Sequence, residues 1–393
     1  MWAGAKVKQY SSIDSAYEGE PQLIQDLTET KQHCKVLMIK DIRQVLMDES
    51  GRTIAGSRRY TAESLGKMCK WLSSGLPSVV LSLKEREGTK VPGLMEAPRD
   101  DGAVIDIVNR VAECRFEAKL QNRRLIVDVR DDTIIGILDK RYLAFSTLDA
   151  YLQTAAFVYG LPGFEGAEFH EAHVINDRIF SRWRCLPPVL AVFNDYFRER
   201  FYYGFQIVNS YSASPTYKIA PMIVRANDNS QFLFPYVPNL HGGTATISVN
   251  SKKGDPSDRL EALAERARKL LPSAEKIRDK VIEAKSIRLG LGVNSTNHQK
   301  RMTAVLKSLK VNSQGLSDEF FARVNRRVMV SNHLGSETDS YDGGSMVSWS
   351  SRSIFDLAVA ISQAGHQSKA YDYDTTVAAD RLACLVLMSE LFR

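Results

Sequence analysis

Apolar residues recur at helical spacing in the first third of the chain. In TAESLGKMCKWLS, residues 61–73, they fall on one helix face, and Thr61 can cap the first turn. Residues 103–120 show the same spacing. The pattern predicts two amphipathic helices, separated by a polar loop with glycine and proline over 83–102.

Alternating apolar and polar positions dominate the middle of the chain. Residues 123–130 alternate, Asp131-Asp132 is a turn signal, and residues 133–142 form the returning strand, which together predict a β-hairpin. Residues 200–249 are the most strand-like part. They hold nine aromatic residues, namely Phe201, Tyr202, Tyr203, Phe205, Tyr211, Tyr217, Phe232, Phe234 and Tyr236.

A further strand is predicted over 179–185. Neighbouring side chains on a strand point to opposite faces, so Trp183 lies opposite Arg182 and Arg184. We expect Trp183 in the core and both arginines exposed.

Beyond residue 250 the spacing is helical. Asp255 and Pro256 form a helix start signal, and a second helix with Ile277, Val281 and Ala284 inward follows Pro272. We therefore expect an α+β fold with a mixed or antiparallel sheet core, flanking helices and an all-helical C-terminal third. The expected segments are an N-terminal α/β part with a mobile loop (1–102), the sheet core (103–250) and a basic helical region (251–393).

The composition is that of an ordinary globular protein, with 44% hydrophobic and 25% charged residues. The five cysteines are far apart and form no CxxC pair, which favours reduced thiols over disulfides or zinc. No apolar run is long enough for a bilayer and no leader is visible at the start. We expect a cytoplasmic protein, in the host cytoplasm if it is phage-encoded, with no membrane partner.

The positive charge is concentrated in one region. Residues 251–330 hold 18 of the 52 Lys and Arg residues but 9 of the 46 Asp and Glu residues. A local basic surplus is typical of a polyanion binder, and equally of solvated helix faces. Cations beside aromatic rings also suit phosphates and stacked bases. The candidate nucleic-acid-binding residues are Arg123, Arg124, Lys140, Arg141, Tyr142, Arg182, Arg184, Arg200, Tyr202, Tyr203, Lys218, Arg225, Lys252, Lys253, Lys276, Lys280 and Lys285.

Other chemistry has less support in the sequence. There is no P-loop and no GxSxG, and no cysteine has the surroundings of a nucleophile. His170 and His173 lack the HExxH spacing, and on a strand they would point to opposite faces, so we interpret them as surface or edge histidines. Asn209-Ser210 at a strand end favours a turn role over catalysis. We expect no catalytic residue, cofactor or metal.

Three segments together resemble a known family. They are 124–153 (RLIVDVRDDTIIGILDKRYLAFSTLDAYLQ), 201–229 (FYYGFQIVNSYSASPTYKIAPMIVRANDN) and the helical last third. Their order resembles the phage- and plasmid-encoded family of unknown function numbered nine hundred and thirty-two among such domains, over roughly 50–390. The chain departs from it where a Cys-Asn pair often follows the arginine, since Ala226-Asn227 follow Arg225 here.

The resemblance implies a mixed α+β fold and a phage or mobile-element setting, but no established reaction. Phage proteins of this profile include single-stranded DNA binders and annealers, some acting in early transcription. The sequence thus favours a single-stranded DNA or other nucleic-acid-binding protein of phage replication, recombination or early to middle transcription. The alternative is a non-enzymatic structural or interaction subunit of a phage assembly. Expected partners are nucleic acid, a phage RNA polymerase or replication protein, and further copies of the chain.

Overall fold

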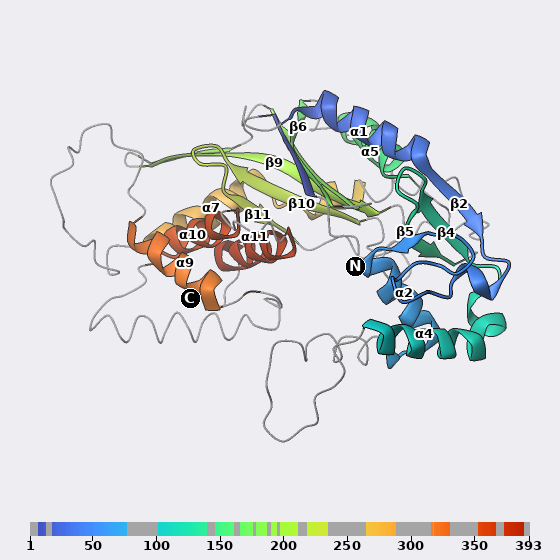
Figure 1. The fold of residues 1–393 in the computed structure, drawn as a ribbon. Coiled ribbons are helices and arrows are strands. Elements are labelled where there is room, and N and C mark those ends of the chain that lie inside the picture. Colours follow the sequence, from blue (N-terminus) through green and yellow to red (C-terminus); the bar gives the residue numbers. More distant parts are fainter. Residues whose placement is uncertain are drawn as a thin grey trace, which may run out of the picture.

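The structure is a computed structural model of an α+β protein built on two sheets (Figure 1). It describes residues 7–12, 18–76, 101–139, 146–160, 166–175, 178–186, 190–194, 197–210, 218–234, 265–287, 316, 318–330, 353–366 and 373–388. The α+β class and the antiparallel or mixed sheets expected from the sequence are confirmed.

The larger sheet has seven strands in the order β1-β6-β7-β9-β10-β11, with β8 paired to β9. Its strands are β1 (Val7–Ser11), β6 (Ala167–Ile175), β7 (Arg178–Cys185), β8 (Leu190–Asn194), β9 (Phe197–Ser210), β10 (Lys218–Arg225) and β11 (Gln231–Leu233). The long β9 pairs with β7, β8 and β10. Gly204 brings β9 close to β7, since a Cβ at this position would lie 2.2 Å from the Trp183 carbonyl oxygen.

The two faces of this sheet differ in chemistry. On one face Phe205 and Ile207 of β9 pack with Trp183 against α1 (Glu20–His33) and α5 (Thr147–Gly160). Trp183 is 0% exposed, which confirms its predicted core position. On the other face Gln206 lies beside Arg182 of β7, and this polar face holds the candidate site.

The smaller sheet runs β2 (Cys34–Met38), β4 (Arg124–Asp128), β5 (Thr133–Leu138) and β3 (Arg59–Tyr60). The predicted hairpin is confirmed as the antiparallel pair β4–β5. One face is covered by α2 (Ala62–Leu72), α4 (Asp101–Arg115) and the π-helical turn η2 (Phe116–Leu120), which share its core. Thr61 caps α2 as predicted, because its hydroxyl accepts the Ser64 backbone N–H. A short 3-10 turn, η1 (Ile42–Gln44), follows β2.

Helices α7 (Ala274–Ser286), α9 (Asp318–Val330), α10 (Ile354–His366) and α11 (Tyr373–Met388) gather on the β11 side of the larger sheet (Figure 1). Ile277, Val281 and Ala284 are buried, as the helical spacing predicts. Ser273 caps α7 directly after Pro272. The predicted helix start at Asp255-Pro256 lies outside the described residues, as do the loop over 83–100 and residues 1–6.

Strand pairs connect the sequence segments. β1 pairs with β6, β2 with β4, and β3 with β5, so both sheets contain strands from before and after residue 103. Over the part of the chain that the structure describes, every helix is too short or too polar to cross a membrane.

Candidate functional site

Arg182 is the centre of a buried polar cluster on the face of the larger sheet described above. Its side chain is 1% exposed, and its Nη2 lies 2.9 Å from Asp380 Oδ2 while Nη1 lies 3.1 Å from Glu171 Oε1. The guanidinium also donates to Gln206 Oε1 at 2.8 Å and to Gln231 Oε1. Four elements, β6, β9, β11 and α11, therefore meet at one side chain.

The expected exposure of Arg182 is wrong. The alternation along β7 is as predicted, but the face opposite Trp183 is covered, because α11 brings Asp380 onto it from 198 positions later in the chain. Arg184, on the same face, is 19% exposed, so its expected exposure holds only in small part.

The two carboxylates beside Arg182 are both held by several partners. Burial by itself would raise the pKa of Glu171, but the charge of Arg182 and smaller contributions from the neighbouring histidines together outweigh burial and lower that pKa below its usual range. Glu171 also accepts a bond from Gln231 Nε2 at 3.0 Å. Asp380 is 0% exposed and accepts from the Ser362 hydroxyl at 2.9 Å. Both carboxylates are thus satisfied in a site that excludes most water.

A β-bulge places two histidines on this cluster. Phe169 pairs with Trp183 and Glu171 with Arg182, so the register skips His170. As a result His170 and His173 both line one cavity, and they are 4% and 5% exposed. The predictions of opposite faces and of surface or edge positions are wrong for this pair. Burial lowers the pKa of each imidazole to about 4, so both are neutral at pH 7.

The pKa of a third histidine is shifted in the opposite direction. His366, at the end of α10, has Nε2 3.1 Å from both Asp380 carboxylate oxygens. Burial lowers its pKa, but the charge of Asp380 and this hydrogen bond raise it overall. His366 Nδ1 has no hydrogen-bond partner among the described residues. The cluster thus contains two imidazoles whose pKa values are lowered and one whose pKa is raised.

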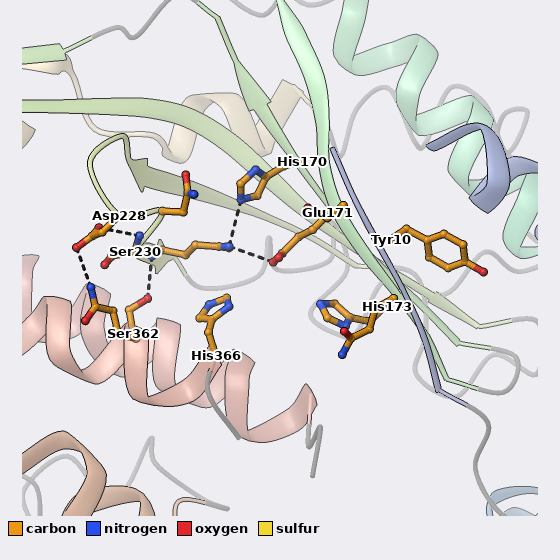
Figure 2. Close-up of a pocket in the computed structure, with 13 residues that line it drawn as sticks. Tyr10, His170, Glu171, His173, Asp228, Ser230, Ser362 and His366 are labelled. Atoms are coloured by element: carbon orange, nitrogen blue, oxygen red, sulfur yellow. Dashed lines mark hydrogen bonds between the residues drawn. The ribbon is translucent and has the colours of Figure 1, made fainter. Parts of the chain in front are cut away.

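A cavity of about 310 Å³ adjoins the cluster. Figure 2 shows its walls: β1 and β6, the turn between β10 and β11, and the last turns of α10. The Tyr10 ring points away from it, into the core on the other face of the sheet (Figure 2). The polar side chains that line it include Gln9, His170, His173, Asn229, Ser230 and His366.

The histidines do not form a metal centre in the residues described, since no three His, Cys, Asp or Glu side chains there are arranged to hold an ion. The buried cysteines Cys69 and Cys384 have pKa values raised by burial, Cys69 to about 11, so neither resembles an activated nucleophile. The cavity is best suited to hydrogen bonding with a bound molecule.

A second ionic network borders the cavity. Arg225 makes two bonds to Glu199, at 2.7 and 2.8 Å, and one to Asp228 at 2.6 Å. Lys285 of α7 donates to Glu199 at 2.7 Å. Gln363 of α10 donates to Asp228 at 2.8 Å, and both of these side chains line the cavity wall. Lys285, predicted as a nucleic-acid contact, therefore fastens α7 to the sheet, and Arg225, predicted likewise, holds the two acids that α7 and α10 contact.

Several other predicted cations and rings also have partners inside the fold. Arg123 pairs with Asp139, and its guanidinium lies 4.5 Å from the centre of the Trp71 ring. Arg184 pairs with Glu168 at 2.5 Å and lies over the Tyr202 ring at 5.2 Å. Tyr203 donates its hydroxyl proton to the Pro272 carbonyl at 2.8 Å. Lys280 pairs with Glu283 at 3.3 Å.

The remaining predicted residues fall into two groups. Arg200 and Lys276 are exposed, and Arg124 and Lys218 are half-buried. Outside the described residues lie Lys140, Arg141, Tyr142, Lys252 and Lys253. The candidates that lie within the described residues are thus spread over both sheets and α7 and are not gathered on one face.

Sequence reasoning did not identify the residues that complete the cluster, Gln206, Gln231, Ser362, His366 and Asp380. A local signal exists for some of them. Ser362 and His366 are four residues apart in a helix with Leu357, Ile361 and Ala364 buried, and Asp380 lies among buried alanines and leucines of α11. A polar residue on an apolar helix face requires a buried partner.

Comparisons with protein-family models, with curated proteins and with solved structures gave no match to this chain.

Proposed function

We propose that the protein binds a small, uncharged, hydrogen-bonding ligand in the cavity between β1, β6, the β10–β11 turn and α10. The observation that carries this proposal is the cavity itself, which has a volume of about 310 Å³ and is lined by Gln9, Asn229, Ser230 and three histidines. This volume is at the lower end of the range for ligand sites. The walls are held by buried side-chain bonds and are therefore preformed.

The charges around the cavity favour an uncharged ligand. Glu171 and Asp380 share Arg182, and His366 supplies a second positive charge when protonated. Asp228 has Arg225 as its partner. His170 and His173 are neutral at pH 7. Since positive and negative groups compensate, an ion entering the site would lose its hydration without gaining a counter-charge.

The test is ligand-dependent thermal stabilisation with a cavity-filling variant and a matched control. Gln9 and Lys8 are neighbours on β1; Gln9 lines the cavity, whereas Lys8 is 60% exposed and pairs with Asp26. A panel of uncharged sugars, polyols, amides and nucleosides is screened against the wild type, Gln9→Trp and Lys8→Trp. A ligand at 100 times its Kd stabilises the folded state by about 2.7 kcal/mol.

We expect at least one uncharged compound to raise the Tm of the wild type and of Lys8→Trp, but not that of Gln9→Trp. The proposal is rejected if no compound of the panel stabilises the protein, or if Gln9→Trp responds as the wild type does.

Nucleic-acid binding is a second candidate, supported by cations that point to solvent along residues 265–287. Lys269 is 67% exposed, Arg278 is 49% exposed, and Lys276 is also exposed. Ala267 and Ile277 of this segment are buried against the sheet, so the cations lie on its outer side. Exposed acids such as Asp279 reduce the local surplus.

Salt-dependent binding of fluorescent single- and double-stranded oligonucleotides tests this second candidate. Replacing Lys269, Lys276 and Arg278 with alanine should weaken binding and reduce the salt slope by about one for each phosphate that the variant no longer neutralises. Replacing the exposed Lys70 and Lys119 near the smaller sheet is the control and should leave the slope unchanged. Absence of binding to either oligonucleotide at low salt would reject this candidate.

A further inference from the structure

Several polar groups in the cavity walls are not used by the fold. The Gln9 and Asn229 side-chain amides have no hydrogen bond within the part of the chain that is described, and neither does the Ser230 hydroxyl. Ser230 is 2% exposed, so its hydroxyl cannot turn to bulk water. A buried hydroxyl without a partner is unfavourable unless a bound molecule supplies one.

These groups lie on opposite walls. Gln9 comes from β1, at the position paired with His173 of β6, whereas Asn229 and Ser230 come from the β10–β11 turn. Asn229 has φ 56°, a backbone conformation that asparagine tolerates better than most residues. A molecule bound in the cavity would thus lie between the Gln9 amide on one wall and the Asn229 amide on the other.

We propose that the ligand is a nucleobase, either of a free nucleoside or of one unpaired nucleotide in a strand. This inference rests on the proposed function of the cavity as a ligand site. A primary amide presents a donor and an acceptor side by side, which is the arrangement that pairs with the adjacent donor and acceptor on a base edge.

The imidazole rings of the cavity can supply a second interaction with a base, namely stacking. His170, His173 and His366 line the same cavity, and aromatic side chains including histidine stack on unpaired bases. The first two are neutral, so they offer a ring face without attracting a phosphate into the cavity.

The carboxylates argue against a sugar as the ligand. A carboxylate can accept from two neighbouring sugar hydroxyls, but Glu171 and Asp228 in this wall are each bonded to an arginine and a glutamine. Among the described residues, the groups left to a ligand include the Gln9 and Asn229 amides, the Ser230 hydroxyl and the Nδ1 atoms of His170 and His366, which match a planar ring with mixed donors and acceptors.

The experiment is calorimetric titration of the full chain with the four nucleosides, with ribose, and with an oligonucleotide of four mixed bases. The variants are Gln9→Leu, which removes the amide at similar volume, and Ser230→Ala, which removes a hydroxyl that the described fold does not use. Lys8→Leu is the matched control on the same strand.

We expect at least one nucleoside to bind the wild type and Lys8→Leu, and ribose not to bind. Gln9→Leu should weaken binding about 5- to 150-fold, the range for removing one bidentate pairing with a base. Ser230→Ala should keep the Tm of the wild type and weaken binding to a smaller extent. If Gln9→Leu does not fold, the binding measured for Ser230→Ala tests the inference instead.

The outcomes separate this inference from the proposed function. Binding of ribose as tight as that of the nucleosides overturns the assignment of a nucleobase but not the proposal that the cavity binds a ligand. Absence of binding by every uncharged compound overturns both. Nucleoside binding that the oligonucleotide does not share supports a free nucleoside, whereas oligonucleotide binding sensitive to Gln9→Leu supports an unpaired nucleotide in a strand.

Discussion

Two arginines of the larger sheet, Arg182 and Arg225, each bridge two acidic side chains, but in different settings. Arg182 is 1% exposed and is the only lysine or arginine side chain that pairs with Glu171 and Asp380 among the described residues. Arg225 is 16% exposed and shares Glu199 with Lys285. Both cations of this second network also lie over the Phe355 ring, at 5.2 and 4.8 Å.

The two networks therefore differ in how far they depend on a single cation. In the second network two cations match two carboxylates, so one cation can be lost without leaving both acids unpaired. In the first, one arginine serves two carboxylates, and His366 adds a positive charge beside Asp380 only when it is protonated. Burial of a charge without a partner costs several kcal/mol, so the Arg182 network depends far more on its single cation.

The largest expected effect comes from Arg182→Met. The change leaves Glu171 and Asp380 buried without their guanidinium, and we expect a loss of about 3–5 kcal/mol in the free energy of unfolding. Urea unfolding at pH 7 measures it. Arg184→Met, on the same strand and face, removes a pair that is partly exposed and should cost less than about 1 kcal/mol. Equal losses in the two variants would contradict the assigned difference in burial.

A change in pH should also separate the two networks. The folded-state pKa of His170 and of His173 is lowered to about 4, so each adds stability that is present above the usual histidine value and lost as pH falls. Between pH 7 and pH 5 each should contribute a loss of roughly 2 kcal/mol. His366, whose pKa is raised, has the opposite sign and offsets part of this loss.

Unfolding of His170→Gln at the two pH values provides the measurement. Its drop should be smaller than that of the wild type by about 2 kcal/mol. The control is Lys285→Met in the second network, which should have the wild-type drop. The pKa of Glu199 lies below its usual value, because Arg225 and Lys285 outweigh the effect of burial. Its contribution is therefore lost only below this pH window. A wild-type drop in His170→Gln would show that this histidine is not held neutral.

More of the fold than of the candidate site could be predicted from the sequence. Helix α2, its Thr61 cap and the β4–β5 hairpin depend on neighbours within a few residues, and these were predicted correctly. Trp183 was also placed correctly, because alternation is a local property. Each of these elements carries its own signal.

The site depends on contacts that no local pattern contains. Whether the Arg182 face is open or covered is decided by α10 and α11, almost two hundred residues later. The inward direction of His170 is decided by a bulge, which one strand cannot reveal without its partner. Lysine and arginine side chains were predicted to lie at the surface because most such side chains do. The acidic residues that pair with several of them in this fold come from other helices and strands.

The loss expected for Arg225→Met is smaller than that for Arg182→Met, and it completes the comparison of the two networks. Glu199 would keep Lys285 at 2.7 Å, and Asp228 would keep the Gln363 amide at 2.8 Å, so neither acid becomes isolated. The lost charged hydrogen bonds should then cost about 1–2 kcal/mol, measured by urea unfolding at pH 7. Lys285→Met should cost a similar amount, since Arg225 still holds Glu199 through two bonds. In the double variant Glu199 has lost both of its cations. The combined loss should therefore exceed the sum of the single losses, and simple additivity would show that the two cations do not substitute for each other.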